Sequence, residues 1–286
     1  MDKTDFIKKI RTNPKTQNKR GDNKISKMNI KFLLIIVLIF ATFNFVSSNP
    51  LEVSNITEIN SSRPSAQNPD SVEAEAGYVT ELSVFGYSNT RSWQGYYGNV
   101  TGSLILSDAS RNTMYNWSVL SPRGQIYSST NSSIQWQNTQ CFNYTAAGNF
   151  SDDTANAGST SLYGTNLTQL ESRFNIPYDA ADGVNETFIY SGASGHVPFY
   201  VGNLEFSQGE CKSTRIYGSG GTQNQYEFEE VLLYEPQTTS TIFTSILNND
   251  LLGFNGKSYD FQMIVLEDGR GTDTSTTEYY FYLEIE

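Results

Sequence analysis

The amino-acid sequence predicts an all-β protein, an antiparallel β-sandwich built as one large or two small sandwiches, with one or two short helices. Apolar and polar residues alternate with a period of two in many short segments, the pattern of a half-buried strand. Turn-forming residues separate these segments, and two stretches show helical spacing instead. Tyr and Phe, which favour strands, contribute 18 and 17 of the 286 residues.

Residues 1–48 are predicted to be a basic segment followed by a signal peptide. The apolar run 32–46 is shorter than the roughly 20 residues that span a bilayer, and the small residues Val46-Ser47-Ser48 after it suit cleavage. Met28 opens a leader of ordinary length, so we expect it to be the true start. The alternative is an uncleaved anchor, in which residues 32–46 are the only membrane contact. Both place the rest of the chain outside the cell.

The predicted exported part is strongly acidic. The first 31 residues hold ten of the 19 Lys and Arg and three of the 30 Asp and Glu, which leaves nine basic and 27 acidic residues, a net charge of −18, for residues 49–286. Such a surface repels phosphate backbones and anionic lipids, so nucleic-acid binding is excluded.

The two cysteines, Cys141 and Cys211, are predicted to form a disulfide, because an exported chain meets an oxidising environment. A metal site is poorly supported, since His196 is the single histidine and no cysteine pair has ligand spacing. No cofactor motif is present.

Residues 49–76, rich in Asn, Ser and Pro, are predicted to be a linker, with donation of a strand to a neighbouring subunit as the alternative. A β-sandwich ectodomain is expected over residues 77–286. Its first strand is predicted at residues 80–84, before a turn region around residues 93–97. Strands at 104–106, 115–119 and 125–128, separated by polar turns, predict an antiparallel meander.

The second half of the ectodomain continues this pattern. Helices are predicted near residues 167–174 and 241–247, where apolar residues have helical spacing. Asn255-Gly256 predicts a hairpin turn. Further strands are expected at 188–190, 197–201, 214–217, 227–234, 259–265 and 279–285.

Nine Asn-x-Ser/Thr sequons predict N-glycosylation, against about five expected by chance from the composition of residues 49–286. The middle residue is apolar or aromatic in six of them, as expected for a sugar-bearing outer face above a packed core. The predicted sites are Asn55, Asn60, Asn99, Asn116, Asn131, Asn143, Asn149, Asn166 and Asn185.

Four segments carry a resemblance: residues 93–102 (WQGYYGNVTG), 114–118 (MYNWS), 259–263 (YDFQM) and 279–282 (YYFY). They resemble uncharacterised sequon-rich, β-rich secreted or cell-surface proteins of uncultured archaea, over about residues 77–286. The resemblance implies a cell-envelope location and transfers no catalytic residue.

Candidate chemical sites are weak. His196 lies next to serines in sequence, whereas catalytic Ser–His pairs come from distant positions. The acidic clusters 152–153, 179–182 and 227–230 are typical of solvated faces, and residues 267–273 suit a long hairpin turn better than a calcium loop. A sugar-binding platform is the alternative use of the aromatic residues Trp93, Tyr96, Tyr97, Trp117 and Trp136.

We therefore expect an extracellular or cell-surface glycoprotein with a structural or adhesive role and no catalytic activity, which assembles with itself or with a cell-envelope partner. The alternatives are a secreted carbohydrate-binding module, whose partner is a glycan, and a secreted hydrolase. Because residues 186–286 lack sequons, we expect the contact face there, with Tyr280 and Tyr282 pointing outward.

Overall fold

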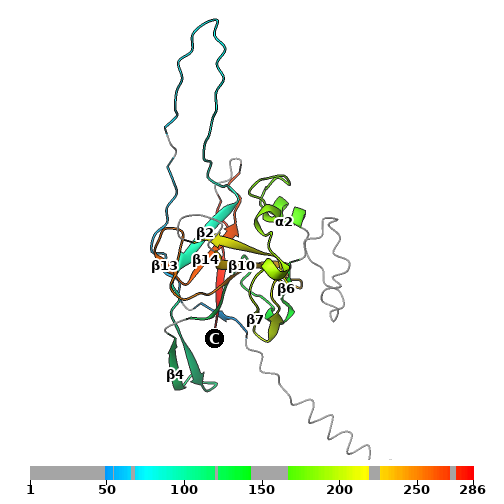
Figure 1. Cartoon of the computed structure of the whole chain (residues 1–286). Helices are drawn as coiled ribbons and strands as arrows, with labels where there is room; N and C mark the ends of the chain where they lie inside the picture. The colour runs from blue at the N-terminus through cyan, green and yellow to red at the C-terminus, as the bar shows by residue number, and fades with distance from the viewer. Residues whose placement is uncertain are drawn as a thin grey trace, which may run out of the picture. The chain divides into compact units, whose positions relative to one another are not determined.

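A computed structural model describes residues 49–53, 55–65, 68–119, 122–142, 167–218, 226–270 and 275–286 (Figure 1). The predicted signal peptide and the sequons at Asn143, Asn149 and Asn166 lie outside this part of the chain. The fold is all-β and antiparallel, as the sequence predicts, with short helices.

Within the described residues, the main sheet has seven strands in the order β1-β15-β5-β11-β10-β6, with β9 added on β10. Every neighbouring pair in it is antiparallel. The strands are β1 (Leu51–Glu52), β5 (Gly124–Ser129), β6 (Gln140–Cys141), β9 (Ser213–Tyr217), β10 (Tyr226–Glu235), β11 (Ser240–Ile246) and β15 (Tyr280–Ile285).

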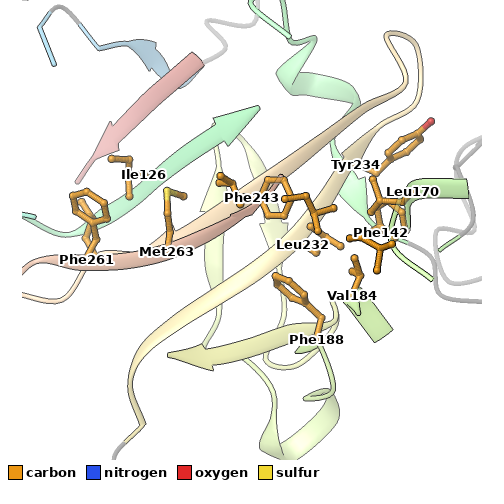
Figure 2. Packing of buried hydrophobic residues seen from close by; sticks show 14 of the residues in the cluster. Ile126, Phe142, Leu170, Val184, Phe188, Leu232, Tyr234, Phe243, Phe261 and Met263 are labelled. Carbon is orange, nitrogen blue, oxygen red and sulfur yellow. The ribbon is translucent and has the colours of Figure 1, made fainter. Parts of the chain in front are cut away.

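The central strands of this sheet are apolar on both faces because each face packs against a separate core. In β10, Leu232 faces the first core and Leu233 the second. Figure 2 shows part of the first core. Its buried residues are Val100, Ile126, Phe142, Leu170, Ile176, Val184, Phe188, Leu232, Tyr234, Phe243, Leu247, Phe261, Met263, Val265 and Leu266. Those of the second core are Tyr127, Trp136, Phe199, Val201, Phe206, Cys211, Val231, Leu233, Ile242, Ile246 and Tyr282.

A two-stranded sheet of β2 (Trp93–Gly98) and β14 (Phe261–Leu266) covers the first core. Side chains from the main sheet bond to the edge of β14 that faces away from β2. The Ile264 N–H donates to Glu230 Oε2 at 2.9 Å, and Ser245 Oγ donates to the Gln262 carbonyl at 2.9 Å. The Tyr279 hydroxyl donates to the Leu266 carbonyl at 2.6 Å. These bonds satisfy backbone groups that a buried strand edge would otherwise leave unpaired.

Smaller elements surround the two layers. The second core is covered by the hairpin β7 (Phe199–Val201) and β8 (Leu204–Phe206) and by the 3-10 helix η1 (Trp136–Asn138). Leu170 of α2 (Leu167–Arg173) and Val184 of α3 (Val184–Thr187) enter the first core. The remaining elements are β3 (Gly102–Ser107), β4 (Thr113–Val119), β12 (Leu251–Leu252), β13 (Ser258–Tyr259) and the 3-10 helix η3 (Gly192–Ser194).

Several sequence predictions are confirmed. Helix α2 lies where helical spacing predicts it, and β10, β14 and β15 match their predicted ranges closely. The hairpin turn at Asn255-Gly256 joins β12 to β13, with Gly256 at φ +76, a conformation that favours glycine. Cys141 and Cys211 form the predicted disulfide.

Other predictions are wrong. Residues 241–247 form most of strand β11 rather than a helix, and residues 80–84 carry no strand. The predicted meander does not form, because β5 pairs with β11 and β15 rather than with β4. Residues 93–97 belong to strand β2 rather than to a turn region. Part of the predicted linker, Leu51–Glu52, pairs as β1 with β15 of its own chain.

The predicted outward orientation of Tyr282 on β15 is also wrong, because that face of the strand packs against the second core. Tyr282 is buried against Trp136, with 5.0 Å between the ring centroids. Its hydroxyl donates to the Asn131 carbonyl at 3.0 Å. Tyr280 is partly buried against the same core. The two tyrosines therefore belong to the interior and its margin.

Candidate functional site

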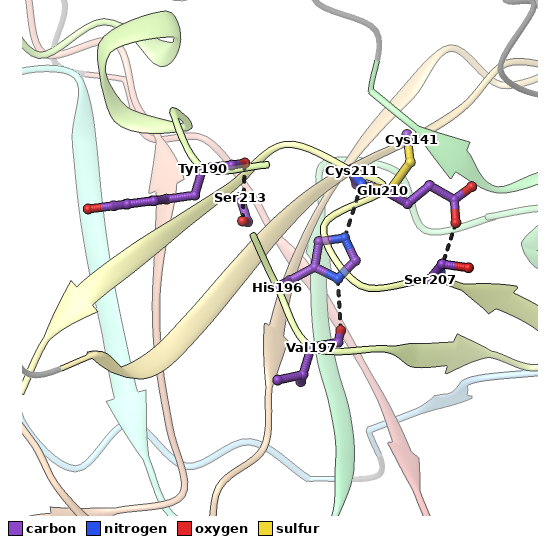
Figure 3. The surroundings of a disulfide bond; sticks show 8 residues. All are labelled: Cys141, Tyr190, His196, Val197, Ser207, Glu210, Cys211 and Ser213. Carbon is purple, nitrogen blue, oxygen red and sulfur yellow. Dashed lines mark hydrogen bonds between the residues drawn. A yellow bond between two sulfur atoms is a disulfide. The ribbon is translucent and has the colours of Figure 1, made fainter. Parts of the chain in front are cut away.

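His196 is held as a buried structural residue. Its Nδ1 lies 2.8 Å from the Val197 carbonyl, and the Cys211 N–H donates to its Nε2 at 3.0 Å (Figure 3). Together these contacts define the neutral ring, with the proton on Nδ1. Burial lowers the pKa of His196, which keeps the ring neutral. With both nitrogens engaged inside the protein, this histidine is no general base for a substrate.

The disulfide lies beside this histidine. Cys211 belongs to the second core, and Cys141 on β6 pairs with Leu233 of β10. The Glu210 carboxylate accepts from the Ser207 N–H at 2.7 Å in the same loop. The disulfide therefore ties this loop, which precedes β9, to the far edge of the main sheet.

The acidic clusters have structural partners. Asp182 accepts from Thr90 Oγ1 at 2.7 Å and pairs with Arg270 at 2.9 Å. Burial alone would raise the pKa of Asp182, but bonds from Thr90 and Ser92 and the Arg270 charge hold it below its usual value. Glu229 lies 3.7 Å from Arg215. Asp152 and Asp153 lie outside the described residues.

Glu230 is the exception among these carboxylates, because it is wholly buried without a cation. Its Oε2 accepts one backbone N–H, and its Oε1 has no hydrogen-bond partner among the described residues. Burial raises the pKa of Glu230 well above its usual value. The group is enclosed between β10 and β14 and bonded to the Ile264 N–H, so we assign it a structural role.

Residues 267–273, which suit a long hairpin turn better than a calcium loop, have few of the oxygen atoms that a calcium ion would need free of other bonds. Thr277 bonds to the Glu267 carboxylate, and Asn175 and the Arg270 N–H bond to that of Asp268. Asp273 lies outside the described residues. Over the described part of the chain, no group of three or more His, Cys, Asp or Glu side chains is placed to hold a metal ion.

The five aromatic residues of the predicted platform lie in separate places. Trp136 is buried in the second core. Trp93 and Tyr96 pack against the first core, and the Trp93 indole N–H donates to the Asp182 carbonyl at 2.7 Å. Only Tyr97 and Trp117 are exposed, and they belong to different surfaces. A single platform of all five is therefore wrong.

The surface that carries Trp117 is one face of the β3–β4 hairpin. Register pairs Leu104 with Trp117 and Leu106 with Tyr115, so these four side chains point the same way. We call them the hairpin face. Their exposed fractions lie between 41% and 57%, and the Tyr115 and Trp117 rings are 4.6 Å apart. The hairpin extends away from the main sheet in Figure 1, labelled β4. The face is an apolar surface without a cover among the described residues.

The opposite face of the hairpin is more polar and carries a sequon. Asn116 pairs with Ile105, and Ser103 pairs with Ser118. A glycan on Asn116 would therefore project from the side opposite to the hairpin face.

The other described sequons differ in accessibility. Asn55, Asn60, Asn99 and Asn185 are exposed, like Asn116. The Asn131 side chain is partly buried, and its Nδ2, the atom that would carry a glycan, donates to Ser240 Oγ at 2.9 Å. Of the apolar middle residues, Val100 is buried as expected, whereas Ile56 and Trp117 are exposed. Tyr144 and Phe150 lie outside the described residues.

Tyr97 belongs to a second surface, a cleft of about 1000 Å³ on the face of β2 and β14 that turns away from the first core. We call it the aromatic cleft. Tyr97 lies 5.0 Å from Phe254 and 4.8 Å from Tyr259, measured between ring centroids. Tyr217 also lines it, as do Arg63 and Arg91. The sequence gives no sign of this grouping, because its residues come from five separate segments that are brought together only by the fold.

No protein-family model, curated protein or solved structure matches the chain. Among the described residues, no helix has the length and apolar character needed to cross a membrane.

Proposed function

We propose that this chain is an exported extracellular or cell-surface glycoprotein with a structural or adhesive role. The observation that carries the proposal is the hairpin face, an apolar and aromatic surface on a strand pair that extends into solvent. Export, predicted from residues 32–48, supplies the setting in which the Cys141–Cys211 disulfide is stable.

The energetics of the hairpin favour a partner. A two-stranded hairpin is marginally stable in water unless another surface packs against it. Full burial of a large apolar side chain stabilises by about 1.5–3 kcal/mol. The four side chains of the hairpin face are each about half exposed, so covering them would contribute roughly 1 kcal/mol apiece. This surface is therefore suited to contact with another macromolecule.

The sequons support the same role. Five of the six described sequon asparagines are exposed, and Asn116 lies on the opposite side of the hairpin from its apolar face. Glycans there would cover the polar side and leave the apolar side open for contact. This arrangement supports a role in assembly or adhesion.

Native protein and two hairpin variants test this proposal. Intact mass reports signal cleavage and glycan load, and electron microscopy with analytical ultracentrifugation reports assembly. We expect Leu104→Ser with Trp117→Ser to abolish assembly, and Ile105→Ser on the opposite face to leave it unchanged. A native protein that is strictly monomeric, unglycosylated and unable to adhere to cells would contradict the proposal.

The aromatic cleft favours a second candidate function, carbohydrate binding. Sugars stack on exposed aromatic rings, and Tyr97 and Phe254 offer two beside polar side chains such as Gln94. A glycan array with Tyr97→Ala and Phe254→Ala tests it, with Trp117→Ala as a control outside the cleft. No binding, or binding that neither cleft variant weakens, would remove this candidate.

A further inference from the structure

A second segment with exposed apolar side chains precedes β2 in the sequence. Residues 78–87, which we call the arm, are described as an extended segment without helix or strand. Leu82 and Val84 are 59% and 87% exposed. The arm belongs to the long cyan excursion in Figure 1.

The arm has the pattern of a strand that lies on an apolar surface. Leu82 and Val84 fall on one side of an extended chain, and Glu81 and Ser83 lie on the other, between Val79 and Phe85. Within the described residues, no surface of its own chain covers Leu82 or Val84. The ten residues of the arm are long enough to follow β3 or β4, which have six and seven. The arm and the hairpin face are thus matched in length and apolar character.

The arm and the hairpin carry too little net charge to repel each other strongly. The arm holds one charged residue, Glu81, and the hairpin from residue 102 to 119 holds Asp108 and Arg111, which cancel. The rest of residues 49–286 accounts for nearly all of the net charge of −18. Two copies of the chain would repel each other over most of their surface, and least at these two elements.

The arm and the hairpin leave β2 at opposite ends. The arm precedes Trp93, and the hairpin follows Gly98, so the six residues of β2, about 17 Å, separate their starting points. A donor and an acceptor at opposite ends of one strand suit a head-to-tail contact, in which each copy donates in one direction and accepts from the other.

We infer that the arm of one copy docks on the hairpin of a second copy, with Leu82 and Val84 against the hairpin face. This inference rests on the proposed assembly role and names its partner, a second copy of the same chain. The contact is heterologous, so it leaves one free arm and one free hairpin face at the ends of every assembly. Repetition of the contact produces a ring or an open filament.

Two loss variants of the full chain test the inference by complementation. The arm variant is Leu82→Ser with Val84→Ser, and the hairpin variant is Tyr115→Ser with Trp117→Ser. The matched controls are Val79→Ser with Phe85→Ser on the other side of the arm, and Ile105→Ser on the other face of the hairpin. Analytical ultracentrifugation measures assembly, and circular dichroism verifies that each variant keeps the wild-type fold.

We expect the wild type and both controls to assemble, and each loss variant to be monomeric, with its dissociation constant raised roughly 100-fold or more. An equal mixture of the two loss variants should form a complex of two copies and grow no further, because one intact arm meets one intact hairpin. Loss variants that assemble, or a mixture that stays monomeric, would overturn the docking while the proposed role stands. A monomeric wild type would also overturn the docking, whereas the proposed role would fall only if the native protein were in addition unglycosylated and unable to adhere to cells.

Discussion

The buried carboxyl of Glu230 predicts that stability falls as pH rises above the usual pKa of a glutamate. This side chain accepts a hydrogen bond from the Ile264 N–H and so joins the main sheet to the β2–β14 sheet, and in the part of the chain that the structure describes its Oε1 has no hydrogen-bond partner. Burial raises its pKa well above the usual 4.5, so the folded protein holds the carboxyl protonated where the unfolded chain has released the proton. Glu230→Gln imitates the protonated form without the ability to ionise.

The sign and size of the effect follow from proton linkage. Below pH 4.5 both states carry the proton, and Glu230 contributes its full stability. Above pH 4.5 the unfolded state alone loses the proton, which lowers the free energy of unfolding by about 1.4 kcal/mol per pH unit. The loss continues until the pH passes the raised pKa of the folded state. The Gln variant should therefore gain stability relative to wild type by that amount for each pH unit.

Urea unfolding at half-unit steps between pH 4.5 and 8 measures this difference. Tryptophan fluorescence is a suitable signal, because Trp93 packs against the first core and Trp136 lies in the second. The difference between variant and wild type cancels the other titrating groups, provided that the disulfide stays intact.

A second substitution separates ionisation from hydrogen bonding. Glu230→Ala also removes the pH dependence, but it leaves the Ile264 N–H without an acceptor, which costs about 1–3 kcal/mol at every pH, in addition to lost packing. We expect the Ala and Gln curves to run parallel, with Ala lower. A constant difference between Glu230→Gln and wild type from pH 5 to 8 would refute a protonated Glu230.

Three further predictions concern stability. Replacing Cys141 and Cys211 by Ala should cost about 4 kcal/mol, because the disulfide closes a loop with a sequence separation of 70, and reduced wild type should show a similar urea midpoint. Because the pKa of His196 is lowered in the folded state, the unfolded chain takes up the proton first, and wild type should lose stability as pH falls from 6.5 to the folded-state pKa. Melting curves of His196→Gln should lack this loss. Tyr282→Thr should lower the free energy of unfolding by about 3 kcal/mol in urea titrations, because it opens a cavity beside Trp136. A small change in the free energy of unfolding would contradict the burial of Tyr282.

The sequence predicts strands well where one face differs from the other. Tyr259, Phe261 and Met263 alternate with the polar residues Ser258, Asp260 and Gln262, and β14 lies where that pattern places it. The strand prediction fails at β11, because this strand is apolar on both faces. Phe243 enters the first core, and Ile242 and Ile246 enter the second. A strand that is apolar on both faces loses its period of two, and its residues then imitate helical spacing.

At the arm, the sequence predicts a strand that the structure lacks. Leu82 and Val84 alternate as in a strand, yet no strand forms there, because pairing depends on a neighbour that local sequence does not specify. The hairpin face was partly predictable, since the strands were expected and Trp117 was among the candidate aromatic residues. Its exposure was not, because periodicity shows that a face is apolar without showing whether another layer covers it.

The place of β15 in the main sheet sets the order in which the protein can fold. This strand, Tyr280–Ile285, lies between β1 and β5, so a segment near residue 50 has no partner until residues 280–285 have been synthesised. During synthesis the chain therefore remains without its complete sheet while the preceding 230 or so residues emerge. A fold whose sheet is completed by a late strand therefore reaches its full stability only when synthesis is nearly finished.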